Sequence, residues 1–396
     1  MDDVVIVDAV RTPMGRGKPG GALSGVHAVD LLAQTITGLL RRVDLDPAVV
    51  DDVIVGCVSQ AGEQAGNVGR MAWLAAGLPE HVPAVTVERK CGSSQQSLHF
   101  AAQGVLAGAY DVVVVAGVES MSRIPMGAAR LGMDTAGPSV TRRYEPGLVS
   151  QGVSAELVAA RWKLGRDELD EYSVRSHRLA AEAADSGAFA GEIIPVRVPA
   201  PDGEAEVAAD ETIRRGTTVE RLATLAPAFA DDAVARRFPE ITWSVTAGNS
   251  SQITDGASAL LVMSASRAKA LGLRPRARFH AFSVVGDDPV LMLTAPIPAT
   301  RKVLERAGLT IGDIDHYEVN EAFASVPLAW QAEVGADPAR LNPRGGAIAL
   351  GHPLGASGAR LMTTMLNALE ATGGRYGLQT MCEAGGMANA TVIERL

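Results

Sequence analysis

The sequence predicts an α/β protein made of two halves with the same plan, separated by an inserted segment. Short β-branched runs at 4–7, 53–56 and 111–117 have the character of buried strands, and amphipathic stretches at 28–40 and 93–107 lie between them. Because strands alternate with helices, we expect the N-terminal part to form a largely parallel sheet covered by helices.

The C-terminal part repeats this order. A helical stretch at 299–307 precedes a strand at 316–319, as the helix at 28–40 precedes the strand at 53–56. A turn rich in Gly and Ser opens a helix after Cys91 and again around 355–365, and a strand follows each helix, at 112–116 and at 378–381. We interpret this as an internal duplication. The N-terminal half would span 1–118, completed by about 245–270, and the C-terminal half 271–396.

The segment at 119–244 differs in character. It contains the Arg pairs 142–143, 214–215 and 236–237, and a stretch at 199–211 rich in Pro, Asp and Glu that predicts an exposed loop. The segment is too long for a plain connection, so we expect a lid or binding subdomain with helices of its own at 155–163 and 167–185.

Composition favours a compact intracellular enzyme. Apolar residues make up 47% of the 396 residues and charged residues 20%. Three cysteines argue against a disulfide framework, and no basic, long apolar leader is present at the N-terminus. The net charge of −9 gives no general attraction for nucleic acid. We therefore expect a cytoplasmic protein that binds neither nucleic acid nor membrane.

Cys91 is the first candidate for chemistry, because it lies between an apolar run and a helix start. A helix N-terminus presents unpaired N–H groups and partial positive charge, which stabilise a thiolate. The alternative is a small buried hydrophobe, the ordinary state of an isolated cysteine. Cys382, at a strand end before a Gly-rich turn, has the same two interpretations, whereas Cys57 in a strand is expected only to pack.

Two further polar sites stand in loops. His352 lies in a Gly-rich loop stiffened by Pro353 just before a helix, where the backbone can approach a ligand closely. Asn320 and Glu321 follow a strand, where they would either cap the next helix or hold a water in an active site. His99, inside the helix after Cys91, is expected to be a surface or packing residue.

In combination, these motifs resemble the thiolase superfamily over the whole chain. The resemblance rests on Cys-Gly-Ser-Ser from Cys91, Asn-Glu-Ala-Phe from Asn320, Gly-His-Pro-Leu-Gly around His352 and the Cys382-Glu-Ala-Gly-Gly segment, in this order. It implies a layered αβαβα fold. The overall pattern is most similar to degradative bacterial thiolases of fatty-acid or steroid side-chain breakdown.

The resemblance also implies a reaction and its residues. Cys91 would be the nucleophile and His352 its activator, Cys382 would move the second proton, and Asn320 would hold a water. The backbone N–H groups of Cys91 and Ala384, next to Gly385, would bind the oxyanion. Coenzyme A would enter as a substrate, and no metal is expected.

The coenzyme A contacts implied by the resemblance are Ser251, Ala247, Phe229, Met292 and Phe323, with Arg214 near the nucleotide. The family also implies a homodimer or homotetramer acting on acyl-CoA substrates.

Two departures separate this chain from common family patterns. Many thiolases have three glycines after the second cysteine, whereas Ala384 replaces the first here, and its N–H keeps the oxyanion role only if its φ is negative. The His-Met-Gly stretch of biosynthetic short-chain enzymes appears as Ser150-Gln-Gly, which predicts a different acyl pocket.

Two other functions remain as alternatives. One is a catalytically silent acyl-CoA or lipid-binding protein on the same fold, although all four reactive side chains are present. The other is a decarboxylating condensing enzyme with one Cys and two His, which is disfavoured because Asn320 or Cys382 stands where a second His is needed.

Overall fold

The structure is a computed structural model that describes residues 2–396. Its centre is a ten-stranded mixed sheet in the order β10-β11-β12-β9-β1-β8-β5-β3-β4, with the short β2 paired to β8. The strands are β1 Val4–Arg11, β2 Gly15–Arg16, β3 Asp52–Gly56, β4 Ala84–Val87, β5 Val112–Ser120, β8 Thr254–Ser264, β9 Ala277–Gly286, β10 His316–Val319, β11 Tyr376–Glu383 and β12 Met387–Arg395.

This strand order is that of a duplication. Reading outward from the β1–β9 junction, one side runs β1-β8-β5-β3 and the other β9-β12-β11-β10, so strands at matching places in the two halves hold matching places in the sheet. Within the described sheet, the two half-sheets are joined where Val5 and Ile6 of β1 pair with Arg278 and Ala277 of β9. A sheet divided this way can turn one face of each half toward a shared central layer.

Helices complete five layers, αβαβα. The outer layers are α1 Ala28–Arg42 with α2 Val68–Ala75, and α10 Pro296–Ala307 with α11 Ser325–Val334. The central layer is α3 Ser93–Leu106 with α13 Ser357–Thr372, which pack together between the half-sheets. In α13, 12 of the 16 residues are buried, more than one apolar stripe would bury, as a helix enclosed on several sides requires. The remaining short helices of the two halves are α9 Ala265–Ala270 and α12 Ala347–Leu350.

The expectation of a largely parallel N-terminal sheet is wrong in part. Strand β3 pairs in parallel with β4 and β5, but β8 pairs antiparallel with both β5 and β1. Strand β8 follows the insertion, and its direction is opposite to that of its neighbours β5 and β1. The local alternation of strands and helices does not reveal this direction.

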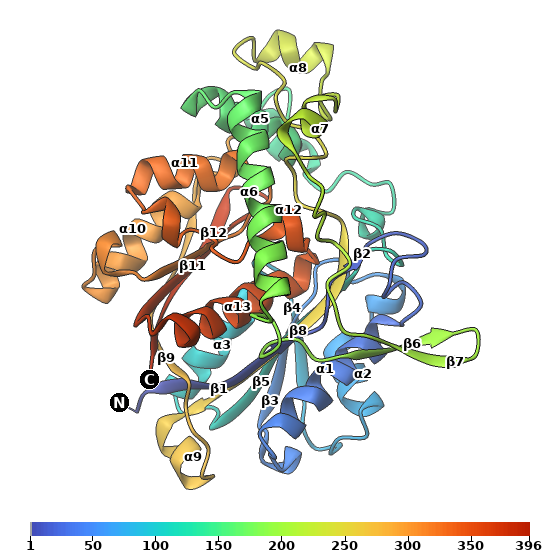
Figure 1. Ribbon diagram of the computed structural model, residues 1–396, viewed down its shortest axis with the longest axis vertical. Coiled ribbons are helices and arrows are strands. Elements are labelled where there is room, and N and C mark those ends of the chain that lie inside the picture. The colour runs from blue at the N-terminus through green and yellow to red at the C-terminus, as the bar shows by residue number, and fades with distance from the viewer. Residues whose placement is uncertain (1) are drawn as a thin grey trace.

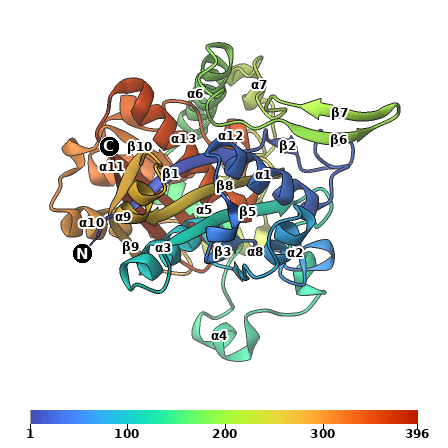
Figure 2. The same cartoon turned by 90° about the horizontal axis from the view of Figure 1, so that it is seen from below.

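Residues 121–253 lie between the paired strands β5 and β8. They form the helices α4 Gly137–Arg143, α5 Gln151–Trp162, α6 Arg166–Asp185, α7 Val219–Ala223 and α8 Asp232–Arg237. Figure 1 shows α5, α7 and α8 together at one end of the molecule, with α6 running down from them across the C-terminal half. Figure 2 shows α4 set apart from the rest of the fold.

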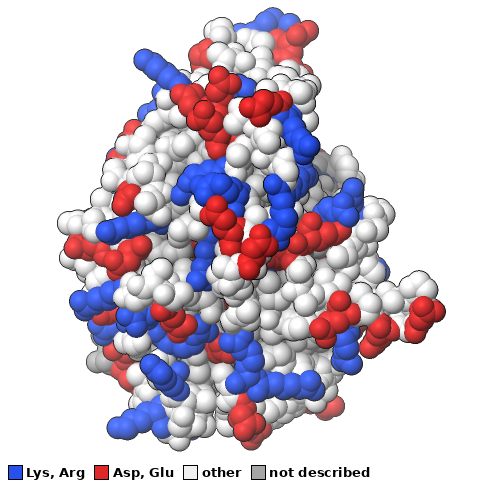
Figure 3. Space-filling view, viewed as in Figure 1, with Lys and Arg blue, Asp and Glu red and all other residues white. Residues whose placement is uncertain are grey.

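The stretch expected as an exposed loop at 199–211 is exposed, but most of it is a β-hairpin. Strands β6 Val196–Ala200 and β7 Gly203–Val207 pair antiparallel, and the hairpin projects from the body with acidic side chains along it (Figure 3). Its turn, Ala-Pro-Asp-Gly-Glu, is a common turn sequence. This signal was present in the sequence and was missed. No helix within residues 2–396 is long and apolar enough to cross a membrane.

Candidate active site

Cys91 lies in the sharp connection between β4 and α3. Lys90 adopts a left-handed backbone with φ 47°, unusual for a residue with a side chain, and Gly92 is the N-cap of α3. The chain therefore turns directly into the helix at the cysteine. The side chain is 5% exposed.

Ionisation of Cys91 is opposed in this unliganded structure. Burial and the nearby carboxylate of Glu383 raise the pKa of the thiol to about 12, although the N–H groups of Cys91 and Ala384 and the charge of Lys90 lower it. The helix-terminal groups thus act in the expected direction, but burial outweighs them. Without substrate these groups alone therefore do not hold Cys91 as a thiolate, and the resting side chain is a neutral thiol.

His352 is held in one tautomer by Ser357. The Nδ1 atom of His352 lies 2.5 Å from the Ser357 hydroxyl oxygen, and that hydroxyl donates its single proton to the Pro353 carbonyl at 2.8 Å. The hydroxyl must therefore accept from Nδ1–H, which leaves Nε2 of His352 without a proton. Burial and Arg360 lower the pKa of His352 to about 3, so the ring is a neutral base.

Asn320 faces that base. Its Nδ2 lies 3.4 Å from Nε2 of His352, and its own backbone N–H donates to the Thr380 carbonyl, two residues before Cys382. Its Oδ1 is buried and has no hydrogen-bond partner within residues 2–396, so it can accept from a water or a ligand. The helix-capping alternative is wrong, because α11 begins at Ser325 with Ala324 as its N-cap.

Cys382 stands on β11, one residue before the strand ends. Burial raises its pKa well above the ordinary value, and Cys91 and Glu383 raise it further, so the two thiols are close enough to affect one another. The left-handed conformations of the following turn fall on Gly385 (φ 94°) and Gly386 (φ 77°), while Ala384 keeps a negative φ. The Ala384 N–H is therefore still directed at Cys91, as the oxyanion role needs.

Close packing at glycines brings the N-terminus of α3 and the N-terminus of α13 together. A Cβ on Gly355 would lie 2.6 Å from the Cys57 Cα, and one on Gly358 would lie 2.3 Å from the Gln95 backbone nitrogen. The Ala359 N–H of α13 donates to the Ser94 hydroxyl of α3 at 2.9 Å. The loops of Cys91 and His352 are therefore fixed against each other by backbone contact. Cys57 itself packs in the apolar core, as expected.

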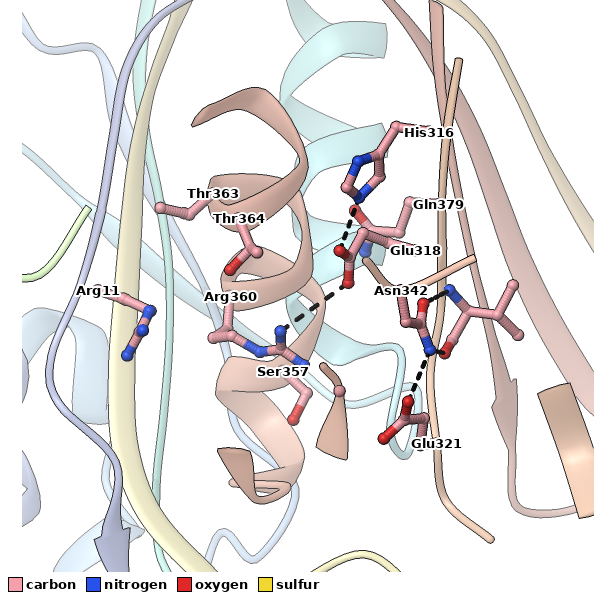
Figure 4. A network of polar contacts seen from close by, with 12 residues as sticks. Arg11, His316, Glu318, Glu321, Asn342, Ser357, Arg360, Thr363, Thr364 and Gln379 are labelled. Atoms are coloured by element: carbon pink, nitrogen blue, oxygen red, sulfur yellow. Dashed lines mark hydrogen bonds and ion pairs between the residues drawn. The ribbon is translucent and has the colours of Figure 1, made fainter. Parts of the chain in front are cut away.

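A network of buried polar side chains surrounds the strand end that precedes Asn320, and Figure 4 shows part of it, including Glu318, Glu321 and Arg360. Glu321 accepts hydrogen bonds from Tyr172, Ser176, Asn342 and the Ile348 N–H, which fixes the strand end beside Asn320. Arg360 of α13 points toward Glu318 of β10, 3.9 Å away, and Glu318 contacts His316 at 2.8 Å. His99 is also buried, stacked on Phe282 and hydrogen-bonded to Thr391, so it packs and is not on the surface.

The expected coenzyme A contacts fall into two groups. Arg214, Ala247 and Ser251 line one surface hollow of about 530 Å³, whereas Phe229, Met292 and Phe323 lie in the apolar core of the C-terminal half, with the rings of Phe229 and Phe323 6.0 Å apart. The Ser251 N–H donates to the Ala322 carbonyl at 3.0 Å, and the His352 N–H to the Gln252 carbonyl at 3.0 Å. The wall of the hollow is thus tied to both catalytic loops.

Sequence reasoning missed four residues of this region. Arg16 and Lys18 line the hollow beside Arg214, Ser357 fixes His352, and Glu383 affects both thiols. Glu383 stands inside the quoted Cys382 motif and Ser357 two residues after the quoted His352 motif, so their chemical type was visible in the sequence. Arg16 and Lys18 are far from the motifs in sequence, and only the fold brings them near.

Comparison with known proteins gives consistent matches. The family description "Thiolase, N-terminal domain" matches residues 4–266 and "Thiolase, C-terminal domain" matches residues 273–395. The chain is 51% identical to a steroid 3-ketoacyl-CoA thiolase of Mycobacterium tuberculosis, over all of this chain and 95% of that protein. It is 46% identical to a 3-ketoacyl-CoA thiolase of Salmonella typhimurium, over the full length of both. The crystal structure of the Bacillus anthracis acetyl-CoA acetyltransferase superposes with a TM-score of 0.88 at 36% identity, covering 100% of this chain and 99% of that one.

Proposed function

Because this chain belongs to the thiolase family, we propose that it cleaves 3-oxoacyl-CoA with coenzyme A into acetyl-CoA and a shortened acyl-CoA by covalent catalysis at Cys91. The same residues would run the reverse Claisen condensation. The observation that supports this proposal is a pair of buried contacts: Cys91 with Cys382, and the unprotonated Nε2 of His352 with Asn320, whose N–H bonds to the Thr380 carbonyl two residues before Cys382. That set supplies a nucleophile, a base, a polar anchor and a proton carrier.

The first half-reaction begins with a neutral pair. Nε2 of His352 accepts the thiol proton as the sulfur of Cys91 attacks C3 of the substrate, the C2–C3 bond breaks, and the acyl group becomes a thioester on Cys91. The acetyl-CoA enolate takes a proton at C2 from Cys382. Its oxygen would be stabilised by His352 and by a water on Asn320.

The second half-reaction restores the enzyme. The Cys382 thiolate accepts the thiol proton of an entering coenzyme A, whose sulfur attacks the thioester carbonyl, and Cys91 leaves and recovers its proton from His352. The N–H groups of Cys91 and Ala384 bind the oxyanion in both acyl-transfer steps. The loss of one such donor typically lowers the rate by about 10²–10³.

The surface hollow is the proposed entrance for coenzyme A. Arg16, Lys18 and Arg214 line it, with Glu211 as a single acidic residue among the lining side chains. This local excess of positive charge suits the phosphates of the nucleotide even though the whole chain is acidic. Ser251 and Ala247 line the same hollow and would contact the pantetheine arm.

Acylation of Cys91 is the direct test. After mixing with acetyl-CoA, intact-protein and peptide mass spectrometry should find an acetyl group on Cys91, and Cys91→Ser should lose both this adduct and thiolysis of acetoacetyl-CoA. Cys57→Ala, which changes a buried thiol outside the site, should keep both. Undiminished thiolysis in the Cys91→Ser protein would refute the mechanism, and binding without an adduct would favour the silent acyl-CoA-binding alternative.

For the acyl group, we propose a 3-oxoacyl chain longer than acetoacetyl, including steroid side chains. The support is the name of the 51%-identical relative and the Ser150-Gln-Gly stretch, where Gly152 lies under the ring of Phe229. Thiolysis kinetics with acetoacetyl-, long-chain and steroid-derived substrates decide this. The highest kcat/KM for acetoacetyl-CoA would contradict it.

We further propose a homo-oligomer in the cytoplasm. Strand β4 is the last strand at one end of the sheet, and apolar side chains are exposed on it and on the neighbouring α3, namely Val85 at 44%, Phe100 at 42% and Leu106 at 43%. Such an edge is suited to pairing with a second copy. Free cysteines at 57, 91 and 382 suit a reducing compartment. Light scattering should report a dimer or tetramer, and Val85→Lys should shift it toward monomer.

A further inference from the structure

Glu383 is a buried carboxyl group that the proposed mechanism does not use. It follows Cys382 on β11 and pairs with Met387 of β12. Its side chain is fully buried, and neither carboxyl oxygen has a hydrogen-bond partner in the described chain, residues 2–396. A Cβ built on Gly92 would lie 1.8 Å from Oε1 of Glu383. The carboxyl group therefore rests against the residue that follows the nucleophile and caps α3.

The surroundings of this group leave its charge uncompensated. Arg89 is the cation whose charge acts on this carboxyl group, yet its Nε is itself buried without a partner among residues 2–396, and no ion pair joins the two side chains there. The other ionisable groups nearby are Glu88, Lys90, Cys91, His99 and Cys382. His99 contributes no charge near neutral pH, because burial lowers its pKa to about 3.

The carboxyl group changes its charge within the working range of an enzyme. Burial raises the pKa of Glu383 to about 8, although the charge of Arg89 lowers it. It is thus neutral at pH 7 and becomes an anion as the pH rises above about 8.

Because Glu383 lies at the N-terminus of α3, its ionisation affects the ionisation of Cys91. A carboxylate and the Cys91 thiolate would share the same partial positive charge of the helix end, and two like charges at one site disfavour each other. We propose that Glu383 is a positioning residue that controls the nucleophile: its neutral carboxyl group permits proton loss from Cys91, and its carboxylate opposes it. This inference rests on the proposed function only in treating Cys91 as the nucleophile.

The test is the pH dependence of Cys91 alkylation. Wild-type protein, Glu383→Gln and the control Glu88→Gln react with iodoacetamide between pH 6 and pH 10, and peptide mass spectrometry quantifies the adduct at Cys91 apart from those at Cys57 and Cys382. Glu88→Gln removes the same charge three residues before Cys91, but at an exposed side chain paired with Lys90.

We expect the ratio of the Cys91 alkylation rate in Glu383→Gln to that in wild type to change with pH. Glu383→Gln and wild type should react alike at pH 6.5, where both groups are neutral, and the variant should react roughly tenfold faster at pH 9.5, the effect of one unit of thiol pKa. Glu88→Gln should show no comparable rise with pH in its rate relative to wild type, because Glu383 remains in place. A ratio for Glu383→Gln that is constant with pH, at one or at any other value, overturns the proposal, because a structural role would act equally at every pH.

Wild-type protein provides a test without any variant. The logarithm of its alkylation rate should rise with a slope below one between about pH 7.5 and 9, where Glu383 ionises, and a straight unit slope would overturn the proposal. Glu383→Ile, neutral and apolar, should restore the unit slope. Failure of the proposed function is seen separately, as the absence of an acetyl adduct on Cys91 whatever the alkylation profile shows.

Discussion

Ser357→Ala removes the group that fixes the tautomer of His352. The Ser357 hydroxyl makes two buried hydrogen bonds, at 2.5 Å to Nδ1 of His352 and at 2.8 Å to the Pro353 carbonyl. Leaving a buried polar group unsatisfied costs about 1–3 kcal/mol. If about 2 kcal/mol of tautomer preference is lost, the ratio of His352 with an unprotonated Nε2 to the other tautomer falls roughly thirtyfold, which is the upper bound on the fall in the active fraction.

We therefore expect kcat for acetoacetyl-CoA thiolysis to fall by up to roughly thirtyfold in Ser357→Ala, with little change in KM, because Ser357 contacts the side of the imidazole away from Nε2. Rapid-mix mass spectrometry of the Cys91 adduct should show the same loss in the acylation step. Both measurements use protein whose unfolding transition is recorded in parallel.

Ser97→Ala is a closely matched control. Ser97 is a buried serine of α3 whose hydroxyl donates to the carbonyl four residues earlier, Ser93, at 3.0 Å, as Ser357 does to Pro353. It makes no contact with His352 among the hydrogen bonds of residues 2–396. Both variants lose a hydrogen bond from a serine hydroxyl to the carbonyl four residues earlier, and only Ser357→Ala also loses the hydrogen bond to His352. A kcat for Ser357→Ala no lower than that for Ser97→Ala would refute the tautomer argument.

Two further predictions concern stability. Burial lowers the pKa of His99 to about 3, so between pH 7 and pH 5 only the unfolded state takes up a proton at this residue. The free energy of unfolding therefore falls by about 2 kcal/mol over that interval. In urea unfolding, His99→Gln should remove about 2 kcal/mol of this pH-dependent fall, whereas His81→Gln, at an exposed residue, should leave it unchanged. Gly355→Ala should lower the free energy of unfolding by about 1–3 kcal/mol or more, because its Cβ would meet backbone atoms of residues 56 and 57 at 2.6–2.7 Å. Gly312→Ala should have little effect, because the Thr310 hydroxyl, 3.7 Å away, is the only atom near its Cβ. Equal unfolding midpoints for the two glycine variants would contradict this prediction.

Local patterns predicted the elements well, because each is set by residues that are neighbours in the chain. The apolar spacing that predicted a helix at 28–40 corresponds to α1, Ala28–Arg42, and the strand predicted at 316–319 is β10, His316–Val319. The duplication, inferred from element order, corresponds to matching strand places in the sheet. The antiparallel return of β8 was missed, because pairing across an insertion of more than a hundred residues leaves no periodic signal in either strand.

The site was predictable as a set of residue types and not as a set of charge states. Cys91, Asn320, His352 and Cys382 were identified from their motifs, and the structure places Asn320 against His352 and Cys382 near Cys91. The neutral resting thiol could not be foreseen, because burial of Cys91 depends on segments as distant as β11. The proximity of Glu383 to Gly92 depends on which face of β11 the side chain occupies, and the sequence gives that alternation without saying what lies on either face.

The neutral resting state explains how a buried thiol can be reactive only when it is needed. Burial moves the pKa of Cys91 upward and that of His352 downward, so both shifts oppose separation of charge into thiolate and imidazolium. That opposition weakens when a substrate carbonyl enters, since negative charge can then pass from the sulfur to an oxygen facing the N–H groups of Cys91 and Ala384. Proton transfer to Nε2 therefore becomes favourable together with bond formation, and not before it. A neutral Glu383 is part of the same balance, because an anion at the α3 N-terminus would oppose the one charge that this step must create.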